Sequence, residues 1–271
     1  MMKRHKSIYV ILTSVLIAFS FYSCETDDVQ TVTTFDDLVL EDEFDGNELN
    51  TSLWSYEIGT GQNGWGNNEL QYYTDRPENV KVEDGKLTIT ARKEAYEGSG
   101  YTSGRIITKV NFEKTYGRFE ARMKLPWGQG LWPAFWLLGA DIDQVGWPQT
   151  GEIDIMEYRG QDPTIIHGSV HGPGYSAGEA ITKTYDLVNS RFDTDYHIFG
   201  IEWGPNYINF YVDDKLYNQI TPADVPGEWV YDKPFFVLIN MAVGGTFVGS
   251  PNENTVFPQT LEVDYVRVYQ D

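Results

Sequence analysis

Alternating apolar and polar positions recur along the chain and predict β-strands rather than helices. Residues 116–125 read Tyr-Gly-Arg-Phe-Glu-Ala-Arg-Met-Lys-Leu, and from the phenylalanine onward apolar and charged side chains alternate. Residues 80–91 and 207–220 each hold two short runs around a turn sequence, Glu-Asp-Gly in the first and Asp-Asp in the second, which predicts two β-hairpins. Residues 261–269 predict a final strand, and no segment carries an apolar stripe of helical period over the length of a helix.

The many short strands, together with 26 Gly and 12 Pro residues, predict an all-β fold. We expect a β-sandwich made of two antiparallel sheets. The chain of 271 residues shows no internal repeat and no long low-complexity linker, so residues 38–271 are expected to form a single domain.

The N-terminal residues have the pattern of an export signal. Residues 1–6 contain three basic side chains, and residues 8–22 are almost uncharged and mostly apolar. A stretch of this length is short for a membrane-spanning helix, which needs about 20 residues. We therefore interpret residues 1–23 as a signal peptide, with a retained membrane anchor as the alternative.

The chain's single cysteine, Cys24, follows the apolar stretch at once. It resembles the acylated cysteine of a bacterial lipoprotein, although Phe21 stands where leucine is usual; an ordinary signal peptide with an incidental cysteine is the alternative. Residues 24–37 would then form the lipidated cysteine and a short polar tether. We expect an exported monomer that is lipid-anchored at the bacterial outer membrane or cell surface and contacts the membrane only through the lipid on Cys24.

Acidic residues outnumber basic ones strongly. The formal net charge is −20, and it becomes −23 without residues 1–23, because these hold three of the 20 basic residues and none of the 40 acidic ones. Such a surface repels nucleic acid and anionic lipid headgroups. It also argues against a strongly anionic polysaccharide and favours a neutral polymer as partner, with simple solubility of a secreted protein as the alternative explanation.

Aromatic residues make up 15% of the chain, and several tryptophans stand next to glycine in loop-like sequences. Such rings are candidates to stack on the apolar faces of sugars, and a core position is the alternative. The tryptophans of this loop type are Trp65, Trp127 and Trp147. Trp132 and Trp136 fit either role. Those for which we favour a core position are Trp54, Trp203 and Trp229.

Three carboxylates stand close together in an otherwise apolar strand, where residues 151–158 read Gly-Glu-Ile-Asp-Ile-Met-Glu-Tyr. Buried acids are costly unless they have partners or a function. In a regular strand Glu152 and Asp154 share one face, and Glu157 points to the other. One β-bulge between Asp154 and Glu157 would bring all three to the same side, and we expect that bulge. Solvated acids on an edge strand are the alternative.

The long side chains of Glu152 and Glu157 could lean toward a substrate between them. Carboxyl groups about 5 to 5.5 Å apart would indicate cleavage with retention, and a separation of about 6.5 to 9.5 Å would indicate inversion. The sequence leaves this distance open.

The acidic segment resembles the Glu-x-Asp-x-x-Glu signature of glycoside hydrolase family 16, in the bulged form typical of laminarinases. Residues 64–73, 131–136 and 167–172 resemble the same branch, and the resemblance covers residues 38–270. It implies a β-jelly-roll with a glycan-binding cleft across the concave sheet. The implied activity is endo-hydrolysis of β-1,3-glucan (laminarin) with retention, with mixed β-1,3/1,4-glucan as a second substrate.

The resemblance also implies a role for each acid. Glu152 would be the nucleophile and Glu157 the general acid and then the general base of a double displacement. Asp154 would orient Glu152, and the negative charges of Glu152 and Asp154 would raise the pKa of Glu157 and keep it protonated. No cofactor is implied for catalysis.

Further positions follow from the same resemblance. The implied sugar contacts are Asn67, Arg105, Trp132, Trp136, Trp147 and His171. A surface ion pair is the alternative for Arg105 and a structural role is the alternative for His171, whereas His167 is taken as structural. Family members often hold one structural calcium ion on the convex side, for which the implied ligands are Glu43, the carbonyl of Gly85 and Asp264.

Three other functions stay open from the residues alone. A related galactan hydrolase, of the agarase or carrageenase type, would use the same acids. A transglycosylase differs only in how well acceptor sugars compete with water. A non-catalytic surface glycan-binding protein would be expected to lack one of the three carboxylates, all of which are present.

Overall fold

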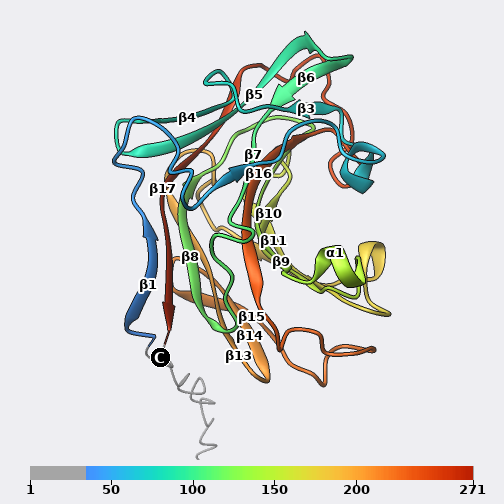
Figure 1. The fold of residues 1–271 in the computed structure, drawn as a ribbon. Coiled ribbons are helices and arrows are strands. Elements are labelled where there is room, and N and C mark those ends of the chain that lie inside the picture. The colour runs from blue at the N-terminus through green and yellow to red at the C-terminus, as the bar shows by residue number, and fades with distance from the viewer. Residues whose placement is uncertain (1–34, 271) are drawn as a thin grey trace, which may run out of the picture. The chain divides into compact units, whose positions relative to one another are not determined.

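A computed structural model describes residues 35–270, which form two β-sheets packed face to face (Figure 1). Every strand pair in these residues is antiparallel except one, the short parallel pair β3 (Gln71–Tyr73) and β6 (Ser99–Ser103). The predicted all-β sandwich is therefore confirmed. The predicted signal peptide, the lipidated Cys24 and most of the tether lie outside the described residues. Within them, the longest helical segments span only a few residues, and none could cross a bilayer.

The larger sheet contains ten strands. Eight follow one another in hydrogen-bonded order, and two further strands pair with members of this row. The row is β15 (Lys215–Ile220), β14 (Tyr207–Val212), β13 (His197–Gly204), β8 (Gly117–Lys124), β17 (Gln259–Gln270), β5 (Lys86–Tyr96), β6 and β3. The two added strands are β1 (Asp37–Asp42) beside β17 and β4 (Val80–Glu83) beside β5.

The smaller sheet contains seven strands and carries the acidic segment near its middle. Its order is β12 (Ile181–Asp186), β11 (Ile165–His171), β10 (Glu152–Tyr158), β9 (Leu131–Gly139), β16 (Phe235–Val243), β7 (Arg105–Ile107) and β2 (Ser55–Tyr56). Three short helical turns lie in the loops, η1 (Gly64–Asn68), α1 (Ile142–Val145) and η2 (Ala177–Glu179).

The core lies between the two sheets, as the alternating pattern predicts. On β8 the side chains of Phe119, Ala121 and Met123 are fully buried in the main hydrophobic cluster. All nine residues of β16 are buried, but its odd-numbered residues belong to the main core and its even-numbered ones face the opposite side of the sheet. The smaller sheet therefore has two covered faces, one against the core and one lining a cleft.

Both predicted hairpins form. Strands β4 and β5 are joined at Asp84 and Gly85, and β14 and β15 at Asp213 and Asp214, and all four turn residues have φ between 50° and 70°. Two consecutive positive φ values give the turn a twist that matches that of the paired strands, which is why Asp and Gly are favoured there.

Candidate active site

The acidic strand β10 contains the predicted bulge. On β11 the partners of Asp154 and Glu157 are Ser169 and His167, so two residues of β10, Ile155 and Met156, lie opposite one residue of its neighbour. The same shift occurs against β9. The extra residue lets the consecutive side chains of Ile155 and Met156 both enter the core, and the alternation then resumes with Glu157 on the side of Glu152 and Asp154.

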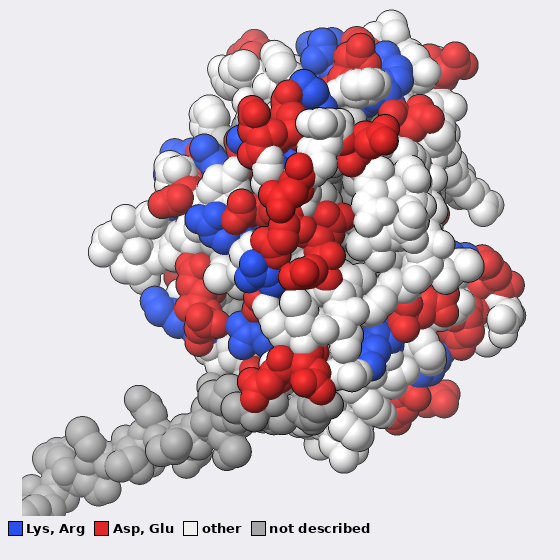
Figure 2. All heavy atoms as spheres, turned by 60° about the vertical axis from the view of Figure 1, so that its left-hand side comes forward, with Lys and Arg blue, Asp and Glu red and all other residues white. Residues whose placement is uncertain are grey.

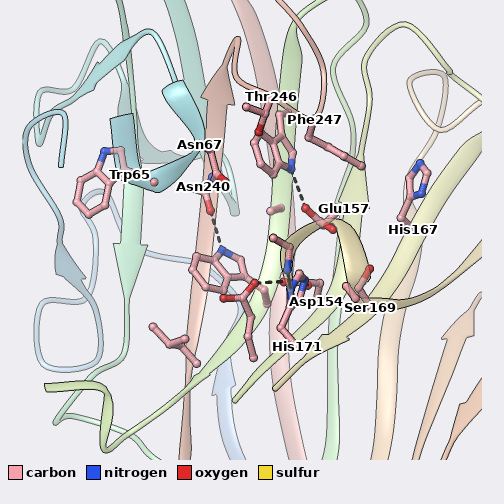
Figure 3. Close-up of a pocket in the computed structure, with 18 of the residues that line it drawn as sticks. Trp65, Asn67, Asp154, Glu157, His167, Ser169, His171, Asn240, Thr246 and Phe247 are labelled. Atoms are coloured by element: carbon pink, nitrogen blue, oxygen red, sulfur yellow. Dashed lines mark hydrogen bonds and ion pairs between the residues drawn. The ribbon is translucent and has the colours of Figure 1, made fainter. Parts of the chain in front are cut away.

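All three acids line one cleft on the outer face of the smaller sheet, with a cavity volume of about 740 Å³ (Figure 3). All the predicted sugar-contact residues line it as well. These are Asn67, Arg105, Trp132, Trp136, Trp147 and His171. The structure thus brings together, from four strands and two loops, every residue that the resemblance assigned to catalysis or sugar binding.

The cleft tryptophans act as hydrogen-bond donors besides presenting flat rings. Trp132 Nε1 donates to Glu157 Oε1 over 3.1 Å, and Trp147 Nε1 donates to Glu152 Oε2 over 3.0 Å. A fixed N–H at each carboxylate restricts its rotation and stabilises its ionised form. The two indoles therefore hold the two glutamates in place.

The carboxylates of Glu152, Asp154 and Glu157 form a row along β10, here called the carboxylate row. His171 on β11 pairs with Glu152 at one end of this row. Its Nε2 lies 2.9 Å from Asp154 Oδ2 and 3.6 Å from Glu152 Oε1. A ring nitrogen of His171 and one carboxylate oxygen each of Glu152 and Asp154 all lie within 4.8 Å of one another. The Trp147 ring covers the imidazole at 5.9 Å between centroids. The prediction that His171 lies in the cleft near Asp154 is confirmed.

The electrostatics of the row favour retention of a proton. Burial, and next the charge of Asp154, raise the pKa of Glu152 to about 8. The same two causes raise the pKa of Glu157 well above its ordinary 4.5. Because a negative charge on one acid disfavours ionisation of the other, at least one of the two glutamates keeps its proton near pH 7. A buried carboxylic acid beside a carboxylate is the arrangement that general acid catalysis requires.

Arg105 lines the cleft, as the resemblance implies, but it does not form the surface ion pair that was the alternative. Its guanidinium lies 4.3 Å from the centre of the Trp65 ring and 5.0 Å from that of Trp136, and its Nε pairs with Glu57. The residue is buried, so this is not a surface ion pair. A guanidinium stacked between two indoles fixes both rings at one end of the cleft, which is a structural contribution to any sugar-stacking surface there.

The other tryptophans divide as follows. Trp54 and Trp203 are fully buried and Trp229 packs partly buried against the core, so the predicted core positions are confirmed. Trp127 is half-exposed and does not line the cleft; the nearest cation to its ring is Arg191, at 5.4 Å. The glycine next to Trp127 gives it a local sequence similar to that of Trp147, yet the fold places only Trp147 in the cleft.

A polar network at the Asn67 end of the cleft was not predicted from the sequence. Glu69 accepts hydrogen bonds from Asn67 Nδ2 (3.2 Å), Gln71 Nε2 (2.7 Å) and the Tyr73 hydroxyl (3.2 Å). Asn240 Nδ2 in turn donates to the Tyr73 oxygen over 3.1 Å, and both Glu69 and Asn240 line the cleft. Asn240 is the one polar residue in the apolar run of β16, a signal that could have identified it.

His167 was interpreted as structural, but it also lines the cleft. Its ring contacts Phe247 edge-on at 5.1 Å (Figure 3). The Arg159 guanidinium covers the same phenylalanine at 4.2 Å. Burial, and next the charge of Arg159, lower the pKa of His167 to about 4, so the imidazole is neutral near pH 7. Residues 159 and 247 gave no recognisable signal in the sequence.

The predicted calcium ligands all lie on or directly beside strands of the larger sheet. Strand β1 pairs with β17 from Val266 onward and β5 pairs with it up to Val263, so Asp264 lies where the two meet. Glu43 directly follows β1, and Gly85 directly precedes β5. Figure 2, which brings the side of β1 and β4 forward, shows acidic side chains gathered in a band on this face.

Oxygen donors of this kind suit calcium. Both carboxylates are also paired with arginine, Glu43 with Arg267 at 2.7 Å and Asp264 with Arg122 at 2.6 Å. The donor set therefore fits a calcium ion only if these two ion pairs open.

Comparison with known proteins agrees with the geometry of the site. The family model described as "Glycosyl hydrolases family 16" matches residues 67–267 of the chain. The chain belongs to this family. It is 42% identical to a β-glucanase of Rhodothermus marinus, over 96% of this chain and 93% of that protein.

Solved structures of family 16 show the same two-sheet jelly-roll. The laminarinase catalytic domain from Thermotoga maritima is 48% identical, with a TM-score of 0.83 over 87% of this chain and 98% of that one. The endo-β-1,3-glucanase from Pyrococcus furiosus is also 48% identical, with a TM-score of 0.83 over 86% of this chain and 94% of that one. As a member of family 16 the protein is a glycoside hydrolase.

Proposed function

We propose that the protein is an endo-hydrolase of β-1,3-glucan that cleaves with retention. The observation that carries the proposal is the bulge in β10, which places Glu152, Asp154 and Glu157 on one side of the strand inside a tryptophan-lined cleft. Glucan is the substrate class named for the similar laminarinases and β-glucanase. Mixed β-1,3/1,4-glucan is a second substrate of the same cleft.

The reaction proceeds in two displacements. Glu152 attacks the anomeric carbon and forms a glycosyl ester, while Glu157 donates its proton to the departing glycosidic oxygen. The ester has no charge, so the pKa of Glu157 falls and its carboxylate takes a proton from the incoming water, which releases the sugar from Glu152. The Trp147 and Trp132 indoles keep the two carboxyl groups aligned, at Glu152 and Glu157 respectively.

A neutral glucan fits the charge and the lining of the cleft. Flat indole surfaces match the apolar faces of glucose rings. The formal net charge of −20 disfavours an anionic polymer.

The test is digestion of laminarin, lichenan and agarose, with product sizing and NMR of the first-formed anomer. We expect internal cleavage of laminarin and an initial β-anomer. An initial α-anomer would exclude the double displacement, and preferential cleavage of agarose would replace the glucan by a galactan. Binding of laminarin without any new reducing ends would indicate a glycan-binding protein.

We also propose that Cys24 carries a lipid that anchors the exported protein at the bacterial outer membrane or cell surface, and that the folded chain is a monomer. The pattern of residues 1–24 supports the first proposal. Mass spectrometry of the N-terminal peptide from membrane fractions of the native host and light scattering of residues 25–271 test the two separately. An unmodified cysteine, or a dimeric mass, would contradict them.

A structural calcium ion at Glu43, the Gly85 carbonyl and Asp264 is proposed as an addition to this fold. Their positions at the ends of β1 and β5, where both strands pair with β17, support it. Calcium titration of chelator-treated protein, followed by calorimetry, should raise the melting temperature, and Asp264→Asn should abolish that rise. A melting temperature indifferent to calcium would argue that the arginine pairs alone occupy the site.

A further inference from the structure

The loop of residues 172–180 reaches the carboxylate row with a backbone amide. Its base is a tight turn in which Gly172 and Tyr175 exchange two hydrogen bonds of 3.0 Å, and the buried Tyr175 hydroxyl donates to the Glu228 carbonyl over 2.7 Å. Beyond this anchor the N–H of Ala177 donates to His171 Nδ1 over 3.1 Å. Ala177 has a φ of 51°, a strained value for alanine that aims this amide at the ring.

This contact determines which ring nitrogen carries the proton. A backbone N–H group can only donate a hydrogen bond, so Nδ1 of His171 must accept it with its lone pair. The proton of the imidazole then lies on Nε2, which is 2.9 Å from Asp154 Oδ2 and 3.6 Å from Glu152 Oε1.

We propose that the Ala177 amide is a positioning group of the active site that holds His171 as the neutral Nε2–H tautomer. In this form His171 adds no positive charge beside Glu152. The consequence for catalysis rests on the proposed function, whereas the tautomer does not.

The groups around His171 shift its pKa in opposite directions. Glu152, Asp154 and Glu157 face the ring from β10, and the Tyr231 hydroxyl donates to the His171 carbonyl over 2.9 Å. Burial lowers the pKa of His171, and the carboxylates, Asp154 first, raise it by more, to about 10. An imidazolium, however, would direct a second N–H at the amide of Ala177. Protonation of the ring and docking of the loop therefore exclude each other.

The neutral ring favours the general acid. A positive charge on His171 would lower the pKa of Glu157 and release the proton that the leaving group needs. The docked amide thus helps Glu157 to keep its proton.

NMR of protein labelled with [15N]histidine tests the tautomer directly, because the chain has only four histidines. We expect His171 to be neutral at pH 7, with its proton on Nε2. The decisive variant replaces Ala177 by its α-hydroxy analogue, which turns the amide into an ester and removes only the N–H. It should let His171 take a second proton, shift the alkaline limb of the kcat profile to lower pH and reduce kcat about tenfold.

The matched control is Ala177→Gly, which keeps the N–H and favours positive φ, and it should retain both the tautomer and the pH profile. A doubly protonated His171 in the unmodified protein at pH 7 would overturn the proposal, as would an ester variant with unchanged tautomer and pH profile. If laminarin is not cleaved at all, the proposed function fails, and the NMR result still decides the role of the amide.

Discussion

Both sheets carry pairs of glutamates that are largely shielded from solvent, but the partners of the two pairs differ. On the larger sheet Glu120 and Glu202 are 6% and 2% exposed, and Arg118 contacts them at 2.8 and 3.6 Å. On the smaller sheet Glu152 and Glu157 receive indole N–H groups and have no lysine or arginine partner among the ion pairs of residues 35–270. The permanent charge of Arg118 keeps Glu120 and Glu202 in a purely structural role. In the described part of the chain Glu152 and Glu157 have no such cation, so they are able to exchange protons.

The largest effect should come from neutralising one glutamate of the cleft. Glu152→Gln or Glu157→Gln should lower kcat on laminarin by at least about 10³-fold, because each removes a reacting group. The melting temperature should stay unchanged or rise, since one of two repelling buried acids is gone.

Glu120→Gln is the matched control on the larger sheet. It should leave kcat unchanged and lower the melting temperature, because Arg118 loses a charged partner. Full turnover in either cleft variant would refute the assignment of the catalytic pair.

The next effect concerns stability alone. Arg118→Met should lower the free energy of unfolding by about 3 kcal/mol, because Glu120 and Glu202 would keep their buried charges without a cation. Urea denaturation measures this loss, and kcat of the folded protein should not change. A loss below about 1 kcal/mol would mean that the larger sheet tolerates unpaired acids as the cleft does.

A smaller effect is expected from the arginine that supports the cleft without touching its acids. Arg105→Lys should raise the KM for laminarin about fivefold and leave kcat within about twofold, because lysine cannot stack as a plane between Trp65 and Trp136. Steady-state kinetics separate the two constants. Trp127→Ala, outside the cleft, should leave both unchanged, and a fall confined to kcat in Arg105→Lys would contradict a stacking role.

The last effect is a slope in the pH dependence of stability. The raised pKa of Glu152 means that the folded state binds its proton more tightly than the unfolded state, so the free energy of unfolding should fall as pH rises from 4.5 to about 8. Melting temperatures across this window should fall more steeply in the unaltered protein than in the Glu152→Gln, Glu157→Gln double variant. Equal slopes would place the titrating groups elsewhere.

Much of this arrangement could be predicted from the sequence. Alternation gave the strands because each has one face in the core, and the count of residues between Asp154 and Glu157 required a bulge if all the acids were to meet. The resemblance to family 16 supplied further residues of the cleft from distant segments. These include Asn67 in η1 and His171 on β11.

What the sequence could not supply was contact between residues far apart in the chain. The stacking of Arg105 between Trp65 and Trp136 depends on how a loop folds over two strands, and no local pattern encodes that. The environment of His167 likewise depends on Phe247, 80 positions away in the chain. Trp127 shows the converse, since its local sequence suited a sugar platform and its position in the fold does not.

The extra residue of β10 also couples the chemistry of the protein to its interior. Ile155 and Met156 enter the core side by side, so the strand that carries the acids also inserts one more apolar side chain than a regular strand would. Deleting Met156 would leave the glutamates on a common side, because side chains repeat every two residues, but it would empty a volume in the middle of the molecule. Lengthening the strand by one residue without a second irregularity would send the last acid inward. Changes in length should therefore be tolerated here far less than changes in side chain.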